Sequence, residues 1–257
     1  MKNIEYSLIN DGFCILPKIF SSKIIELAKE GLWDVIQGNY ETGVPPENRF
    51  WNKGDDPKKI IKIDKPHLCN NNIRRLITNF DFGQYLGQIS DARTIQIWHS
   101  QLIWKPPGGG EKGHAGWHCD KQYWPFWEPG KVFTAWIALS NVTENAGPVS
   151  YIVGSNHWDD ISNLDFFDKN LIAQGRLLDK KHPNRTMVNA NIERGQVIVH
   201  SSKVYHCSGA NKSKRPRIGM VVHFCTDEAL RKPVSGDLRN YLNQMDDETV
   251  CPIIYKC

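Results

Sequence analysis

His118 and Asp120 stand one residue apart in the stretch WHCDKQYW, which begins and ends with tryptophan. In an extended strand, residues i and i+2 point to the same side, so this imidazole and this carboxylate would project together. His206, in the phrase VYHCSGA, offers a third ligand far along the chain. Two histidines and one carboxylate form the facial triad of non-haem Fe(II) oxygenases. In a chain with nine histidines, an H-x-D pair by itself also fits ordinary hydrogen-bonded residues.

A hydroxyl and a guanidinium follow His206 at short range. Ser208 comes two residues later, and Arg217 opens the apolar stretch RIGMVVHF. An arginine at the start of a buried strand needs an anionic partner, because an unpaired buried guanidinium is unfavourable. A planar guanidinium beside a hydroxyl suits a carboxylate. The other interpretation is an arginine that reaches solvent at the strand end.

The first ninety residues have a helical pattern. In SSKIIELAKEGLWDVIQG the apolar residues that share one face are Ile25, Ala28, Leu32, Val35 and Ile36. NNNIRRLITNFDFGQYLGQI is a second helical candidate. Between them, segment 39–57 is rich in Pro, Gly and Asn and predicts a long loop of the kind that covers binding sites.

From about residue 92 the pattern changes to short strands. TIQIWHSQLIW, VFTAWIALSNV, GQVIVH and RIGMVVHFC are the strand candidates, and turn signals separate them. The second alternates, so one face would carry Thr134, Trp136 and Ala138 and the other Ala135, Ile137 and Leu139. Such spacing predicts a β-sandwich or barrel in one domain, residues 1–257. Segment 159–186 lacks clear periodicity and is expected to form a second loop over one mouth.

Composition places the chain among ordinary globular proteins. Of its 257 residues, 40% are hydrophobic and 23% charged, and the net charge of +4 comes from scattered basic residues. That scatter argues against a nucleic-acid surface. The seven cysteines include no C-x-x-C pair, and neither a signal-peptide core nor a membrane-length apolar run occurs. We expect a cytoplasmic monomer or homodimer with reduced thiols that binds neither nucleic acid nor membranes.

The chain resembles the phytanoyl-CoA dioxygenase (PhyH) family of Fe(II)/2-oxoglutarate-dependent oxygenases. The matching phrases are DGFCILPKIFSS, QLIWKPPGGG, GWHCDKQYW, TAWIALSNVTENAGPVSYIVGSNHW and HCSGANKSKRPRIG, in the family's order over roughly residues 8 to 226. The resemblance implies a mainly β fold, the double-stranded β-helix (a cupin-like jelly roll), with its core at about 92–226. Helices within about 1–90 would buttress it.

The resemblance also implies roles for individual residues. His118, Asp120 and His206 match the catalytic iron ligands. The positions that match contacts to the cosubstrate 2-oxoglutarate are Gln101, Trp136, Ser208 and Arg217, with Arg217 on the distal carboxylate. Lys62 matches a further family contact only loosely. The aromatic residues expected near the substrate mouth, with ordinary packing as the alternative, are Trp124, Phe126 and Trp127.

The implied reaction uses Fe(II), 2-oxoglutarate and O₂ to hydroxylate an unactivated C–H bond of a small molecule, with release of succinate and CO₂. The substrate would be a secondary metabolite, an amino acid or an acyl thioester. One alternative is a zinc hydrolase with the same ligands, against which Arg217 and Ser208 argue. Another is an inactive family member that acts as a binding protein, against which the intact ligands argue.

Overall fold

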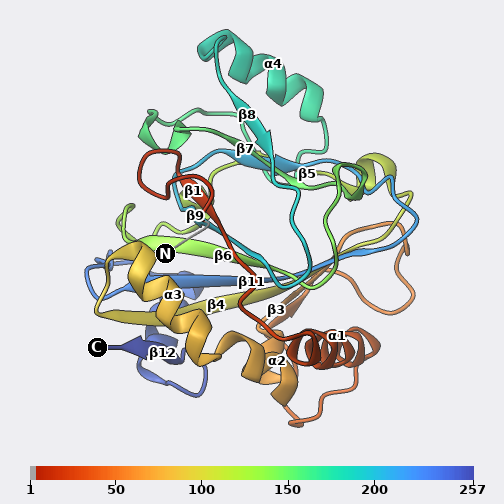
Figure 1. Ribbon diagram of the computed structural model, residues 1–257, viewed down its shortest axis with the longest axis vertical. Helices are drawn as coiled ribbons and strands as arrows, with labels where there is room; N and C mark the ends of the chain where they lie inside the picture. Colours follow the sequence, from red (N-terminus) through yellow and green to blue (C-terminus); the bar gives the residue numbers. More distant parts are fainter. Residues whose placement is uncertain (1–3) are drawn as a thin grey trace.

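The computed structural model describes residues 4–257, and its framework is two antiparallel β-sheets that face each other (Figure 1). The larger sheet runs in the order β1-β9-β6-β11-β4-β3-β2, and β12 also pairs with β4. Its strands are β1 (Phe13–Leu16), β2 (Asn48–Arg49), β3 (Ile61–Asp64), β4 (Thr94–Lys105), β6 (Val132–Ala138), β9 (Val197–Ser201), β11 (Arg217–Thr226) and β12 (Ile253–Lys256). The smaller sheet, in the order β5-β10-β7-β8, consists of β5 (Ala115–His118), β7 (Val149–Ile152), β8 (Met187–Asn189) and β10 (His206–Ser208).

The alternation predicted for β6 divides the interior into two layers. Ala135, Ile137 and Leu139 belong to the core that the large sheet shares with the helices. Trp136 and Ala138 belong to the core that the large sheet shares with the smaller one. The two faces of one strand therefore bury different layers, as in a jelly roll, and the predicted fold class is confirmed.

Three helices cover the outer face of the large sheet: α1 (Ser22–Gln37), α2 (Asn71–Ile77) and α3 (Phe80–Ser90) (Figure 1). The predicted apolar face of α1 is buried in full. Ser21 caps this helix by accepting a hydrogen bond from the amide of Ile24, and Gly38 ends it in the left-handed conformation with φ of 86°. The second helical candidate is two helices, because Asn79 interrupts it and caps α3.

Two expectations about the chain outside the core were wrong in detail. The first ninety residues also hold strands β1 and β3, which belong to the large sheet. Segment 159–186 is not a loop throughout, because it contains the helix α4 (Leu171–Lys181). In that helix only Gln174 and Leu178 are buried, so its sequence needs no long apolar stripe.

The remaining helical elements are short. They are α5 (Arg239–Asn243) and the 3₁₀ helices η1 (Pro66–Leu68), η2 (Gly110–Gly113), η3 (Asp120–Tyr123), η4 (Glu144–Ala146), η5 (Ser155–His157), η6 (Gly236–Leu238) and η7 (Gln244–Asp246). Within residues 4–257, no helix has the length and apolar character that a membrane span requires.

Candidate active site

The three predicted ligands converge between the two sheets. His118 ends β5 and His206 begins β10, and the two residues are register partners in the smaller sheet. Asp120 does not lie in a strand, as the sequence suggested, but at the start of η3. Because Cys119 keeps an extended backbone, with φ of −121° and ψ of 144°, Asp120 still faces the same side as His118. All three side chains are buried, and one ligand atom from each lies within 4.8 Å of the others.

Hydrogen bonds fix both histidines in the tautomer that a metal needs. Nδ1 of His118 lies 2.7 Å from the carbonyl oxygen of Gly116, and Nδ1 of His206 lies 3.1 Å from that of Val204. A carbonyl oxygen can only accept, so each Nδ1 carries the proton. The lone pair on each Nε2 is therefore free for a metal ion.

Asp120 is held so that one oxygen is occupied and the other is free. Its Oδ2 accepts from the Thr134 hydroxyl at 2.6 Å and from Nε2 of His200 at 3.0 Å. Its Oδ1 lies 3.7 Å from Nε2 of His118 and 3.8 Å from Nε2 of His206. Two imidazole nitrogens and one carboxylate oxygen thus face one point, and this donor set fits Fe(II) with open positions for other ligands.

The residues behind the carboxylate form a buried chain of hydrogen bonds. The Thr134 hydroxyl donates its only hydrogen to Asp120. Nδ1 of His223 lies 2.9 Å from the Thr134 oxygen and must therefore be the donor in that contact. On the other side, the Tyr151 hydroxyl donates to Nδ1 of His200 at 2.8 Å. These contacts orient Asp120 from two directions.

The electrostatic environment keeps the ligands in their binding forms. Burial would raise the pKa of Asp120, but the hydrogen bond from His200 and the nearby His206 outweigh burial and lower it well below its usual value. Burial lowers the pKa of His118, and burial with the neighbouring imidazoles lowers that of His206 much further. An ionised carboxylate and two neutral imidazoles are the protonation states that a metal ion requires.

A small cavity of about 90 Å³ joins the triad to Arg217. The four predicted cosubstrate residues, Gln101, Trp136, Ser208 and Arg217, all line it. Arg217 is 3% exposed and stacks over Trp136 at 5.1 Å. Its Nη1 donates to the carbonyl of Gly147 at 2.6 Å, while its Nε has no partner in the described chain. Burial lowers the pKa of Arg217 to about 10, so the guanidinium stays charged at neutral pH.

Lys105 is a second buried basic residue beside Arg217, and it was not among the residues predicted from the sequence. The two residues are register partners on β4 and β11, and Lys105 is fully buried. Its Nζ donates to Ser208 Oγ and to the carbonyl of Gly209, each at 2.6 Å. Burial and the nearby Arg217 lower the pKa of Lys105 well below its usual value, whereas Arg217 stays charged. A buried guanidinium without a counterion within residues 4–257 matches an anionic ligand.

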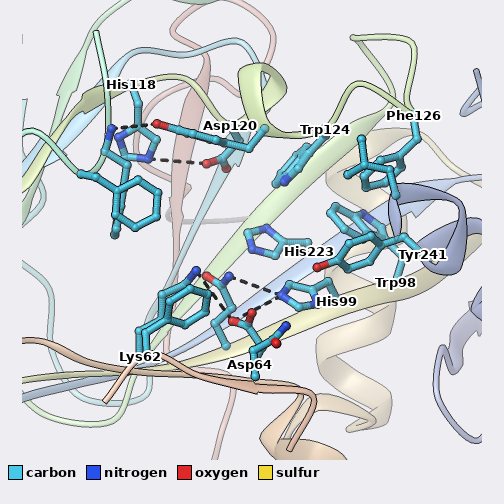
Figure 2. A pocket seen from close by; sticks show the side chains of 17 residues that line it. Lys62, Asp64, Trp98, His99, His118, Asp120, Trp124, Phe126, His223 and Tyr241 are labelled. Carbon is cyan, nitrogen blue, oxygen red and sulfur yellow. Dashed lines mark hydrogen bonds and ion pairs between the residues drawn. The ribbon is translucent and has the colours of Figure 1, made fainter. Parts of the chain in front are cut away.

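A larger cavity of about 260 Å³ lies on the other side of the triad, and Figure 2 shows its side chains. Gln101 lines both cavities, whereas Lys62 lines only the larger one of the two. Trp124 and Phe126 line the larger cavity. Trp127 packs instead in the neighbouring apolar cluster. Segments 39–57 and 159–186, both expected to border a binding site, contribute the lining residues Asn48, Phe50, Phe166 and Phe167.

Comparison with known proteins agrees with this geometry. A family model described as phytanoyl-CoA dioxygenase (PhyH) matches residues 10–219. The chain belongs to the phytanoyl-CoA dioxygenase family. The human peroxisomal phytanoyl-CoA dioxygenase is 25% identical over 145 residues, and a probable phytanoyl-CoA dioxygenase of Caenorhabditis elegans is 20% identical over 171 residues. These matches cover 55% and 59% of this chain but only 43% and 52% of the relatives, so the chain spans about half of their length.

Solved structures share the fold of this PhyH-family chain. The non-heme alpha ketoglutarate dependent carbocyclase SnoK from nogalamycin biosynthesis aligns with a TM-score of 0.70 and 19% identity, over 90% of this chain and 92% of that one. EctD from S. alaskensis, solved with 2-oxoglutarate and 5-hydroxyectoine, aligns with a TM-score of 0.65 and 18% identity, over 86% and 74% of the two chains.

The residues that sequence reasoning missed in this PhyH-family site had weak signals. On β4, Gln101, Ile103 and Lys105 lie at i, i+2 and i+4, so a lysine on the face of the predicted cosubstrate residue was visible. His200 shares a face of β9 with Ile198, which packs between the sheets. Both signals come from the spacing of residues within one strand. Neither shows which other side chain the residue contacts in the folded protein.

Proposed function

We propose that this chain is an Fe(II)- and 2-oxoglutarate-dependent dioxygenase that hydroxylates an unactivated C–H bond of a small molecule and releases succinate and CO₂. One observation carries the proposal: a single cavity connects two features, and a hydrolase would not need both of them. A facial triad with free ligand atoms lies at one end of a cavity, and the buried guanidinium of Arg217, which has no carboxylate partner in the described chain, lies at the other.

In this proposal His118, Asp120 and His206 hold Fe(II). The bound metal would supply redox chemistry with O₂ and a 2-oxo acid. Arg217 binds the distal carboxylate of 2-oxoglutarate through its unpaired Nε edge. Ser208 Oγ accepts a hydrogen bond from Lys105, which leaves the Ser208 hydroxyl hydrogen free to donate to the same carboxylate. The Trp136 ring packs against one face of the guanidinium.

The residues around the triad position substrate and exclude water. Thr134 and His200 fix Asp120, so its free oxygen keeps one direction while ligands exchange. Phe166 packs edge-on against the His118 ring at 5.1 Å and lies at the junction of the two cavities. The larger cavity gives the substrate access to the triad without passing Arg217.

The test is an anaerobic titration of the Fe(II)-loaded protein with 2-oxoglutarate, followed by the visible metal-to-ligand charge-transfer band. Arg217→Ala should retain iron yet weaken 2-oxoglutarate binding by roughly thirty- to several-thousand-fold, because a buried charge pair loses one partner. Arg217→Lys should restore only part of the affinity, since an ammonium lacks the planar fork. The exposed Arg215, changed to Ala, is the matched control.

Superimposable titrations of wild type and the two Arg217 variants would remove Arg217 from the site. Absence of the band in wild type, together with hydrolysis supported by zinc, would favour the metal-hydrolase alternative. Absence of succinate across many substrates, with iron and 2-oxoglutarate bound, would favour the binding-protein alternative.

A further inference from the structure

His223 lies where the two cavities meet. It is 5% exposed, and it is among the residues that line both the smaller and the larger cavity. On β11 its register partners are Thr134 of β6 and His99 of β4. In Figure 2 it lies between Asp120 and His99, close to the metal ligands without being one of them. A substrate in the larger cavity would therefore lie against this imidazole.

One ring nitrogen of His223 is used within the protein and the other is not. Nδ1 donates to the Thr134 hydroxyl oxygen at 2.9 Å, so it carries the ring proton. Burial lowers the pKa of His223 to about 3, and the ring is therefore neutral at neutral pH. Nε2 then has a lone pair to which no group within residues 4–257 donates. Unlike Asp64 Oδ1, which is fully buried, this nitrogen keeps some exposed surface, so a donor on a bound molecule can reach it.

A β-bulge turns the neighbouring rings toward the same cavity. The register of β11 against β4 shifts between His223 and Phe224, so that His223 pairs with His99 and Phe224 pairs with Ile97. Successive residues of a regular strand face opposite sides, yet Trp98 and His99 both line the cavity. The His223 ring stacks on these two rings, with centroid distances of 5.4 Å and 5.6 Å. Stacking and the hydrogen bond at Nδ1 hold the imidazole in one orientation.

A tyrosine hydroxyl reaches the same cavity from the C-terminal part of the chain. Tyr241 on α5 lines the cavity, and its ring stacks on Phe126 at 5.3 Å. Its hydroxyl makes no hydrogen bond within the described chain. Burial, with the nearby Glu47 and Asp64, raises the pKa of Tyr241 to about 12, so the hydroxyl keeps its hydrogen. In Figure 2 the Tyr241 oxygen points toward the centre of the cavity, where His223 lies.

Rings form much of the remaining wall. Trp98 meets Trp124 edge-on at 5.0 Å, and both residues line the cavity together with Phe126. A rigid aromatic wall favours an apolar or flat group, and about 260 Å³ is below the usual range for drug-sized ligands. The enclosed space therefore matches a small molecule with an apolar body, and His223 and Tyr241 offer it one uncharged acceptor and one uncharged donor.

Resting on the proposed function, we propose that the substrate is a small neutral alcohol with an apolar body, and that its hydroxyl donates a hydrogen bond to Nε2 of His223. The hydroxyl of Tyr241 is available to donate to the same substrate oxygen. The apolar body lies against the aromatic wall. Because His118 and Asp120 line the same cavity, this hydrogen bond positions the carbon atoms beside the hydroxyl near the metal ligands.

Charged groups fit this position less well than a hydroxyl does. A carboxylate has no hydrogen at neutral pH, so it cannot donate to Nε2 of His223. An ammonium can donate, and Asp64 also lines the cavity, but the ammonium would lose its hydration beside two uncharged partners and a wall of rings. A hydroxyl donates to the imidazole and accepts from the phenol without burying a charge. The amine is therefore the comparison that the experiment must include.

The first experiment compares probes that share one apolar body: benzyl alcohol, toluene and benzylamine. Their dissociation constants are measured by calorimetry and by protein fluorescence, because Trp98 and Trp124 lie in the wall. The quantity compared between proteins is the ratio of the toluene constant to the benzyl alcohol constant, since the transfer of the shared ring from water cancels when proteins are compared. Cyclohexylmethanol and methylcyclohexane form a second pair without an aromatic ring. We expect an alcohol to bind, and to bind more tightly than benzylamine.

Two substitutions separate the two nitrogens of His223. In His223→Asn the side-chain amide can still donate to Thr134, but the acceptor at Nε2 is lost, so the ratio should fall about three- to tenfold with iron binding unchanged. His223→Gln loses the donor to Thr134 but keeps an acceptor near the place of Nε2. It should keep the ratio within about twofold and bind iron more weakly in a chelator competition.

Two further variants complete the set. Tyr241→Phe keeps the ring but removes the second hydrogen-bonding group, and it should lower the ratio about two- to fivefold. His182→Asn is the matched control, because His182 stacks on Trp158 and lines neither of the two cavities. It should change neither the ratio nor iron binding.

Four outcomes would overturn the proposal: no binding by either alcohol up to its solubility limit, tighter binding of benzylamine than of benzyl alcohol, an unchanged ratio in His223→Asn, or equal losses in His223→Asn and His223→Gln. The titrations are run on the metal-free protein and on the protein loaded with Mn(II) and 2-oxoglutarate. The charge-transfer band with Fe(II) and 2-oxoglutarate is recorded separately. Absence of that band with a His223-dependent ratio would reject the dioxygenase proposal alone, and a normal band without that dependence would reject the alcohol alone.

Discussion

Nζ of Lys105 lies 2.6 Å from the hydroxyl oxygen of Ser208, and Lys105 faces Arg217 across the β4–β11 pairing. A fully buried lysine that touches a hydroxyl and two backbone carbonyls fixes that hydroxyl as an acceptor on one side. The remaining hydrogen of Ser208 is then available to the cavity. Burial and the nearby Arg217 lower the pKa of Lys105 well below its usual value, so Arg217 supplies the positive charge of the site and Lys105 orients its hydroxyl.

Lys105→Met should therefore weaken binding of 2-oxoglutarate, by about tenfold or more, with little effect on 2-oxobutanoate, which lacks the distal carboxylate. The charge-transfer titration is performed with both acids. A purely structural role would weaken both acids alike. Lys23→Met, on the exposed side of α1, is the control.

Asp120→Ala should abolish tight iron binding, because it removes the anionic member of the triad. Metal content after equilibration with Fe(II), and the thermal shift that Mn(II) produces, are the measurements. Wild-type iron content and undiminished substrate hydroxylation in the variant would contradict the role of Asp120.

Thr134→Val should lower iron affinity by roughly 10- to 100-fold, since hydrogen bonds to a ligating carboxylate orient it. The substitution leaves Asp120 Oδ2 with His200 as its remaining donor and leaves His223 without its acceptor. Thr134→Ser keeps the hydroxyl and should bind iron like wild type. If valine and serine behave alike in a chelator competition, the hydroxyl has no part in holding the carboxylate.

Gly219→Ala should destabilise the protein by about 1–3 kcal/mol, the usual cost of overpacking. A Cβ atom at Gly219 would lie 2.2 Å from the Trp136 ring, which in turn supports Arg217. Gly175→Ala is the control in α4, where nothing lies within 4 Å of the added atom. It should stabilise by about 0.5–1 kcal/mol, as alanine does in a helix. Urea denaturation of the two variants gives the comparison, and opposite signs are expected.

Features that depend on short-range backbone geometry could be predicted from the order of the residues alone. The H-x-D spacing placed His118 and Asp120 on one side, because the extended backbone continues through Cys119, one residue beyond the end of the strand at His118. The period of 3.6 predicted the buried face of α1, and the alternation in β6 predicted which residues face each layer. The helix α4 was not predicted, because most of its residues are exposed and its sequence therefore has little apolar periodicity.

Contacts between side chains that are distant in the sequence depend on how the strands pair. His200 and Thr134 hold Asp120 because β9 and β6 are neighbours in a particular register, with Thr134 opposite His200. Lys105 meets Arg217 through the register of β4 against β11. Register is set by the packing of whole sheets, and a slip of one residue would turn each of these side chains to the other face. Spacing within a segment therefore predicted that His118 and Asp120 face the same side, while their hydrogen-bond partners and the position of Lys105 followed from how the strands assemble.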